Sequence, residues 1–201
     1  MKNQPNRPRC PTGAFVEAHG GPAKKHLERL LNERGWQKNL LRLAFGRCSD
    51  VEVYSELAAA DAQAAVVRAV ETWNRVGLRI RVDVTQDLED ADIIVEWTFA
   101  AADPEGTLTW QTQAHADFPP GNSLFGPPPL PIHFNADFLW GIEATGCFDV
   151  ETIALHELGH CLGLVYHSGI DTIMYDAIRE APFFIRHQLD PETQARIRQL
   201  Y

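Results

Sequence analysis

The sequence predicts an α+β fold, because segments with helical apolar spacing and segments with strand patterns both occur along its 201 residues. Residues 58–76 carry apolar side chains at helical intervals, and Gly77 follows them as a residue that readily ends a helix. Residues 78–84 alternate strictly between apolar and charged, which is typical of a strand with one face in water. Residues 93–95 are continuously apolar, which favours a central strand covered on both faces.

Four further segments complete the predicted domain. Residues 40–45 are a candidate first strand. Residues 107–115 and 131–134 are weaker strand candidates, which proline-rich turns separate. A second long helix is predicted over residues 149–164, with Asp149 as its N-cap.

The chain divides into an N-terminal extension, residues 1–39, and one domain, residues 40–201. Residues 1–21 are rich in Pro, Gly and Asn and are expected to be flexible. A short helix is expected over residues 22–34, because Pro22 suits a first helical position and leucines form a stripe behind it.

Composition excludes few classes of function. The formal net charge is −9, which argues against nucleic acid or an anionic membrane as a partner. No apolar run reaches the length of a membrane span, and no apolar signal segment begins the chain, so its compartment stays open. A disulfide between Cys147 and Cys161 is not expected, because the predicted helix separates them too far, whereas a bond between Cys10 and Cys48 stays open.

The segment HELGHCLGLVYH, residues 156–167, carries the chemistry. Residues four apart lie on one face of a helix, so His156 and His160 can direct ring nitrogens at a single zinc ion. Glu157 then stands beside the metal as a candidate general base. Gly163 allows a sharp turn after the helix, which can bring a third ligand back, and His167 is the natural candidate.

This motif, followed by His167-Ser168 and by Ile173-Met174-Tyr175, resembles the metzincins and, within them, the matrixins, a family of zinc endopeptidases. The resemblance covers about residues 40–201. It implies a metzincin-like fold, with a twisted, mostly parallel five-stranded sheet, two long helices and a C-terminal helix over residues 189–201. It also implies one catalytic zinc and hydrolysis of peptide bonds in extended protein substrates.

The resemblance further implies where a substrate would bind. An extended peptide is expected to add to the edge strand near Ala114, and Met174 is expected to form an apolar floor below the metal. Tyr175 begins the segment expected to line the pocket for the residue after the cut. A monomer is expected, acting outside the cell if a leader has been removed.

The spacing of the third ligand departs from the family pattern HExxHxxGxxH. An ungapped match places Tyr166 at the eleventh position, and His167 follows one residue later. We prefer His167, because neutral imidazole is a common zinc ligand, whereas a phenol of pKa about 10 must lose its proton to compete. Tyr166 stays open as the alternative.

Matrixins also carry a structural zinc and calcium ions. His115 and His133 resemble two of the structural-zinc ligands, but residues 98–107, which should supply the other pair, contain no histidine. We therefore prefer two ordinary histidines on neighbouring strands. Calcium is not expected either, because the acidic run near its site is reduced to Asn135 and Asp137.

The extension matches half of a family motif. Matrixin propeptides hold a cysteine that caps the zinc, and Pro8-Arg9-Cys10 repeats the first half of that motif only. We prefer an ordinary cysteine in a flexible tail. Two rival functions also stay open: a non-catalytic binding module with the same fold, against which the intact Glu157 argues, and an intracellular zinc hydrolase of small peptides.

Overall fold

The computed structural model describes residues 35–119, 128–175, 181 and 184–201. The tail, the helix expected over residues 22–34 and Cys10 lie outside the described residues, as do residues 120–127.

The centre of the domain is a five-stranded sheet with the strand order β2-β1-β3-β5-β4. Its strands are β1 (Leu40–Phe45), β2 (Arg81–Val84), β3 (Ile93–Thr98), β4 (Ala114–Ala116) and β5 (Leu130–Asn135). The pairs β1/β2, β1/β3 and β3/β5 are parallel, and β4 alone pairs antiparallel, with His115 opposite His133 on β5. The prediction of a mostly parallel five-stranded sheet is confirmed.

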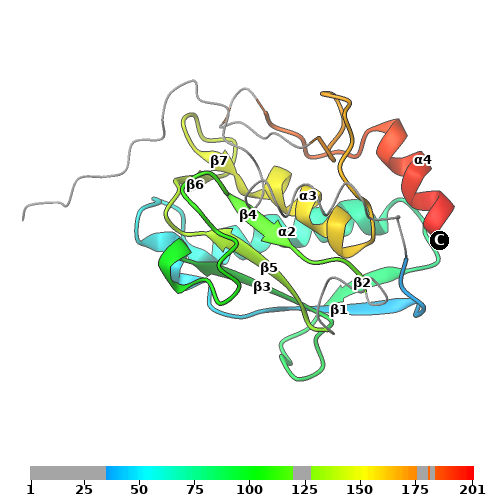
Figure 1. Ribbon diagram of the computed structural model, residues 1–201, viewed down its shortest axis with the longest axis horizontal. Helices are drawn as coiled ribbons and strands as arrows, with labels where there is room; N and C mark the ends of the chain where they lie inside the picture. Colours follow the sequence, from blue (N-terminus) through cyan, green and yellow to red (C-terminus); the bar gives the residue numbers. More distant parts are fainter. Residues whose placement is uncertain (1–34, 120–127, 176–180, 182–183) are drawn as a thin grey trace, which may run out of the picture.

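Helices and short elements surround the sheet. The helices are α2 (Ala59–Asn74), α3 (Val150–Cys161) and α4 (Pro191–Leu200), with 3-10 turns η1 (Ser49–Glu52) and η2 (Ala100–Ala102) and a parallel pair β6 (Trp140–Gly141) and β7 (Phe148–Asp149). In Figure 1, α2 and α3 run next to each other beside the sheet, and α4 lies at the C-terminal end. Helix α2 contacts β2, whereas α3 contacts β4 and β5.

The interface between α2 and α3 is a continuous part of the apolar core. Helix α2 buries one face, since Ala62, Val66, Ala69 and Trp73 are all shielded from solvent. The indole Nε1 of Trp73 donates a hydrogen bond of 3.0 Å to the carbonyl oxygen of Leu155 on α3. This hydrogen bond fixes the position of α3 along α2, and with it the position of the histidines on α3.

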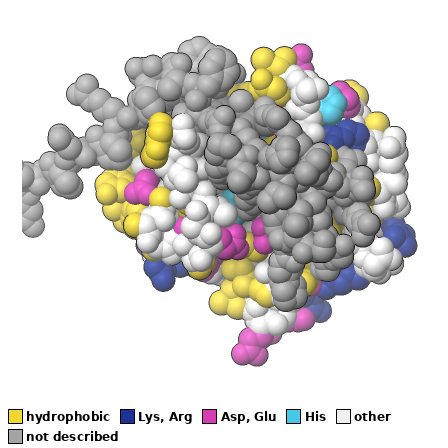
Figure 2. All heavy atoms as spheres, viewed as in Figure 1, with side chains coloured by type: hydrophobic (Ala, Val, Ile, Leu, Met, Phe, Trp, Pro, Cys, Tyr) yellow, Lys and Arg dark blue, Asp and Glu magenta, His cyan; other side chains and the backbone are white. Residues whose placement is uncertain are grey.

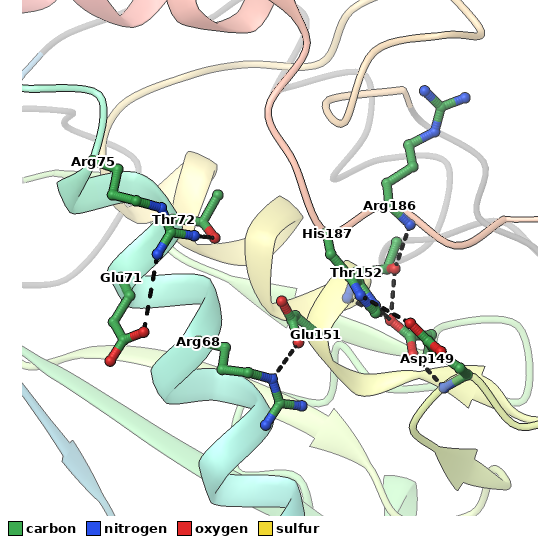
Figure 3. A network of polar contacts seen from close by, with 10 residues as sticks. Arg68, Glu71, Thr72, Arg75, Asp149, Glu151, Thr152, Arg186 and His187 are labelled. Carbon is green, nitrogen blue, oxygen red and sulfur yellow. Dashed lines mark hydrogen bonds and ion pairs between the residues drawn. The ribbon is translucent and has the colours of Figure 1, made fainter.

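Charged groups tie the first turn of α3 to its surroundings (Figure 3). Asp149 caps the helix by accepting a bond of 2.8 Å from the backbone N–H of Thr152, and its carboxylate also meets Nε2 of His187 at 2.8 Å. Burial opposes the charge of Asp149, but hydrogen bonds from Glu143 and Thr152 outweigh this and lower its pKa. Arg68 on α2 reaches the buried Glu151 at 2.6 Å.

The elements agree with the sequence predictions in type but not always in length. The strand expected over residues 78–84 begins only at Arg81, and of the strand expected over residues 107–115 the structure forms only its end, within β4. Trp36, which the sequence analysis assigned to the extension, is buried in the core and donates from Nε1 to the carbonyl oxygen of Cys161 at 2.7 Å. The packed part of the domain therefore includes residues before position 40.

The surface mixes both signs of charge. Carboxylates and basic side chains are interspersed among the described residues on the face in Figure 2. None of the helices in the described part of the chain combines the length and apolarity that crossing a bilayer requires. Among the described residues, no disulfide joins Cys147 to Cys161, as the sequence predicts.

Candidate metal centre

Helix α3 brings His156 and His160 together as the sequence predicts. Their Nε2 atoms lie 3.1 Å apart, and their rings meet nearly edge to face with centroids 4.8 Å apart. Two ligands of a tetrahedral zinc at about 2.0–2.1 Å from the ion would stand roughly 3.3 Å apart. The two nitrogens are therefore spaced as a pair of zinc donors.

Backbone carbonyls hold the other nitrogen of each ring. Nδ1 of His156 lies 2.6 Å from the carbonyl oxygen of Ile173, and Nδ1 of His160 lies 2.8 Å from that of Leu164. A carbonyl only accepts, so Nδ1 carries the hydrogen in each neutral ring and Nε2 keeps its lone pair for a metal. The tautomers are set by the fold.

The end of α3 creates one of these acceptors. Gly163 has a φ of +105°, and the N–H of Leu164 bonds back to the carbonyl oxygen of Gly159 while that of Gly163 bonds to His160. This turn carries the Leu164 carbonyl to the His160 ring. The expectation that Gly163 ends the helix is confirmed.

The carboxyl of Glu157 and the thiol of Cys161 directly follow the two histidines in the sequence. The side chain of Glu157 is buried, and one of its carboxylate oxygens is shielded from solvent. Burial, together with the negative charges of Glu157 and Asp117, raises the pKa of the Cys161 thiol well above its ordinary value. Cys161 is thus held as a neutral thiol and is a poor metal ligand, whereas Glu157 stands next to the donor pair.

Beside the two imidazoles, at the position of the third ligand, the structure places the ring of Tyr166. The Tyr166 ring packs on both histidines, with its centroid 4.7 Å from that of His160 and 5.7 Å from that of His156, and its phenol oxygen is shielded from solvent. His167 instead directs Nε2 at the Glu192 carboxylate on α4, at 2.8 Å. Among the described His, Cys, Asp and Glu side chains, none joins His156 and His160 in a group of three with donor atoms within 4.8 Å.

The remaining predicted residues lie close to this pair. Met174 is fully buried, and a Cβ placed on Gly159 would come within 2.4 Å of its sulfur, so the methionine lies directly against α3. Its burial fits the predicted floor and leaves no side-chain surface for a substrate. Ala114 is buried on β4, which contacts α3, and Tyr175 is half-buried and forms a backbone bridge to His167.

A second cluster unites His115, His133 and Asp103. Nε2 of His115 and Nδ1 of His133 lie 3.1 Å apart, and Oδ1 of Asp103 is 3.1 Å from His133 and 3.6 Å from His115. Burial opposes the charge of Asp103, but hydrogen bonds from His115, Leu108 and Thr107 outweigh this and hold its pKa well below its usual range. The group can hold a metal ion.

Asp103 is the residue that the sequence analysis missed. It lies in the segment of residues 98–107, which was set aside because it lacks a histidine. The signal that could have found it is the pair of carboxylates Asp103 and Glu105, since Glu105 also approaches Nδ1 of His115, at 3.5 Å. Asn135, one of the two residues that remain near the family's calcium position, donates from its side-chain amide to the backbone carbonyls of Thr109 and Thr112.

The mixed sheet, the helix with its paired imidazoles, the buried Glu157 and the methionine beneath them define a domain of the metzincin class. The chain belongs to the matrixin family (Peptidase_M10), whose model matches residues 36–201.

Individual relatives agree with this assignment at low identity. The chain is 31% identical over 130 residues to metalloendoproteinase 1 of Glycine max, covering 58% of this chain and 38% of that protein. It is 25% identical over 205 residues to stromelysin-2 of Rattus norvegicus, covering 98% and 37%, and 26% identical over 187 residues to karilysin of Tannerella forsythia, covering 90% and 36%. The chain thus spans less than two fifths of the length of these relatives.

Proposed function

We propose that this chain is a zinc-dependent endopeptidase that cuts extended protein segments. The observation that carries the proposal is the donor pair, in which the Nε2 atoms of His156 and His160 lie 3.1 Å apart with both Nδ1 atoms held by carbonyls. The buried Glu157 next to this pair favours a catalyst over a binding module that keeps the fold. Membership of the matrixin family supports both points.

Each side chain of the site has a separate task. When bound, zinc would polarise the scissile carbonyl and make its water more acidic. Glu157 accepts the proton of the attacking water and returns it to the leaving amine nitrogen. Phe118, whose ring centroid lies 5.0 Å from that of His160, covers the imidazole and limits the access of bulk water.

The edge of the sheet supports an extended substrate. Strand β4 is the last strand of the described sheet and pairs with β5 along one side only. Its other side offers backbone groups to a peptide in strand conformation, within reach of α3 because α3 contacts β4. We expect that substrate to lie between Ala114 on one side and the segment that begins at Tyr175 on the other. Action outside the cell and a monomeric state accompany the proposal as family expectations.

A second, structural metal ion belongs to the same proposal. Asp103, His115 and His133 offer three converging donors. A structural zinc usually has four protein ligands, so one further donor would complete this set of three. We expect it to join the segment of residues 98–107 to β4 and β5.

The test is a cleavage screen of the zinc-loaded chain on an unfolded protein, on folded proteins and on dipeptides. We expect cuts inside the unfolded chain, none after chelation, and recovery when zinc is restored. His156→Ala is the matched control and should be inactive throughout. Tight binding of the unfolded protein without any cut would favour the binding module, and cleavage of dipeptides alone would favour a hydrolase of small peptides.

A further inference from the structure

We propose that Tyr166, and not His167, supplies the third protein donor of the catalytic metal, as a phenolate oxygen. The inference rests on the proposed metal site and departs from the three-histidine pattern of the family. Its first support is proximity, since the Tyr166 ring lies against both His160 and His156, at centroid distances of 4.7 Å and 5.7 Å. Its phenol oxygen is shielded from solvent, and so are both imidazoles.

The second support is the direction of the chain after Gly163. Residues 165–167 are not helical, and the N–H of His167 bonds to the carbonyl oxygen of Met174 at 2.8 Å in a backbone bridge beside Tyr175. Tyr166 lies against the two histidines, whereas the next residue, His167, directs its ring at Glu192 on α4.

Bringing His167 to the metal would require a shift of one residue, which moves each side chain of the segment to the other side. That shift would break the bond to Met174, the contact of 2.8 Å with Glu192 and the bond of 2.9 Å that Nδ1 of His167 accepts from Gly169. Both ring nitrogens of His167 are thus already engaged in the observed register.

The chemistry of the donor set permits this arrangement. On binding, the phenol O–H bond breaks, an oxygen–metal bond forms, and the proton passes to the buffer, with no change in oxidation state. Two neutral imidazoles and one phenolate leave a coordination position for water or substrate, as a catalytic site requires. A divalent ion beside the oxygen favours its ionised form.

The test replaces zinc by Cu²⁺, because a phenolate bound to Cu²⁺ absorbs visible light by charge transfer and an imidazole at that position does not. We expect the band in the copper-loaded chain and its loss in Tyr166→Phe, with metal affinity lowered more than about 100-fold. His167→Ala should keep the band and bind Cu²⁺ and Zn²⁺ within about threefold of the unaltered chain. Affinity is read by competition with a chelator.

Two variants keep the result decisive. Tyr166→His restores an imidazole donor, so it should bind metal within about tenfold of the unaltered chain yet lack the band, even if Tyr166→Phe fails to fold. His156→Ala should lose the ion of the His156/His160 site and keep the one at Asp103, His115 and His133, and if both ions stay, the site and the proposed function fail. A band without any peptide cleavage would retain the Tyr166 ligand and reject the function. Loss of metal in His167→Ala with the band intact in Tyr166→Phe would overturn the inference.

Discussion

Two pairs of histidines in this chain have nearly the same internal geometry. The His156/His160 rings have centroids 4.8 Å apart at 81°, and the His115/His133 rings have centroids 4.9 Å apart at 86°. In each pair, one nitrogen of each ring lies 3.1 Å from a nitrogen of its partner. The pairs differ in what holds the opposite side of each ring.

Neutral backbone acceptors hold the His156/His160 pair, and carboxylates lie beside the His115/His133 pair. Carbonyls contact Nδ1 of His156 and of His160, whereas the second pair faces Glu105, at 3.5 Å from His115, and Glu96, at 3.7 Å from His133. Carboxylates around an imidazole increase its basicity and its hold on a cation. Carboxylates beside the imidazoles therefore suit a site that keeps its metal ion permanently. Neutral acceptors suit a site whose metal ion must also exchange water and substrate.

The two pairs also differ in the elements that carry them. A single helix presents His156 and His160 four residues apart, so their spacing depends on local geometry alone. His115 and His133 come from paired strands, and Asp103 joins them from a loop, so that their spacing depends on sheet register and on loop structure. The first pair could therefore be predicted from sequence, and the second triad could not.

The largest effect should come from the carboxylates that flank the two pairs. Glu157→Ala should lower peptide cleavage by about 10²–10⁴-fold, because it removes the proton acceptor, while zinc content stays unchanged. Glu105→Ala is the matched control at the second pair and should change the cleavage rate less than about threefold. Initial rates on an unfolded protein and elemental analysis of both variants check this. Equal losses in the two variants would remove the functional distinction between the pairs.

Metal stoichiometry tests the second triad. We expect two zinc ions per chain, and one in His115→Ala and in Asp103→Asn, because each substitution removes a donor of the second group only. A structural ion present at 100 times its dissociation constant stabilises the fold by about 2.7 kcal/mol, so thermal unfolding should shift down by roughly 5–10 °C. His187→Ala, a histidine outside both groups, should keep two ions. One ion in the unaltered chain would show that the second triad is an ordinary polar cluster.

Most of the sheet and the helices follow from patterns within single segments. Strand β1 and helix α2 appear where apolar spacing predicts them, because each buries one face against the core. The alternation at residues 78–84 overstates β2, since its first residues lie before the point where β1 begins to pair, at Leu40 with Arg81. The pair β6/β7 consists of two residues per strand, too few to give a periodic signal.

The sequence alone could not predict which of two neighbouring side chains lies against the His156/His160 pair. Whether Tyr166 or His167 faces the histidines is decided by a backbone hydrogen bond to Met174, seven residues beyond His167. Residue preferences favoured the imidazole, but register places the phenol against the pair. Which of the two side chains lies against the imidazoles depends on tertiary hydrogen bonding, which the residue pattern does not encode.

Gly159 tests the support beneath the helix-borne pair. An added Cβ would lie 2.4 Å from the sulfur of Met174 and 3.3 Å from Trp73, both buried. Gly159→Ala should therefore destabilise the fold by about 1–2 kcal/mol, since overpacking exceeds the gain in helix propensity. Urea unfolding measures this, and Gly159→Ala with Met174→Ala should cost less than the sum of the two single changes. Additive costs would mean that the two residues are not in contact.

The smallest effect concerns the cap of the helix that carries the catalytic pair. Asp149→Asn keeps an acceptor for Thr152 but removes the charge facing His187, so the free energy of unfolding at pH 7 should fall by about 1 kcal/mol. The pKa of Asp149 is lowered in the folded chain, which means that its charge stabilises the fold above the ordinary carboxyl pKa of about 4. That contribution is lost as the pH falls towards the folded-state pKa, so the difference between the two proteins should shrink below about pH 4.

Urea unfolding of chelator-treated samples at pH 7 and about pH 3 measures this difference in the free energy of unfolding without a contribution from metal release. Asp190→Asn, at the cap of α4, should show the same sign, and a difference that grows in acid would show that the Asp149 charge does not stabilise α3.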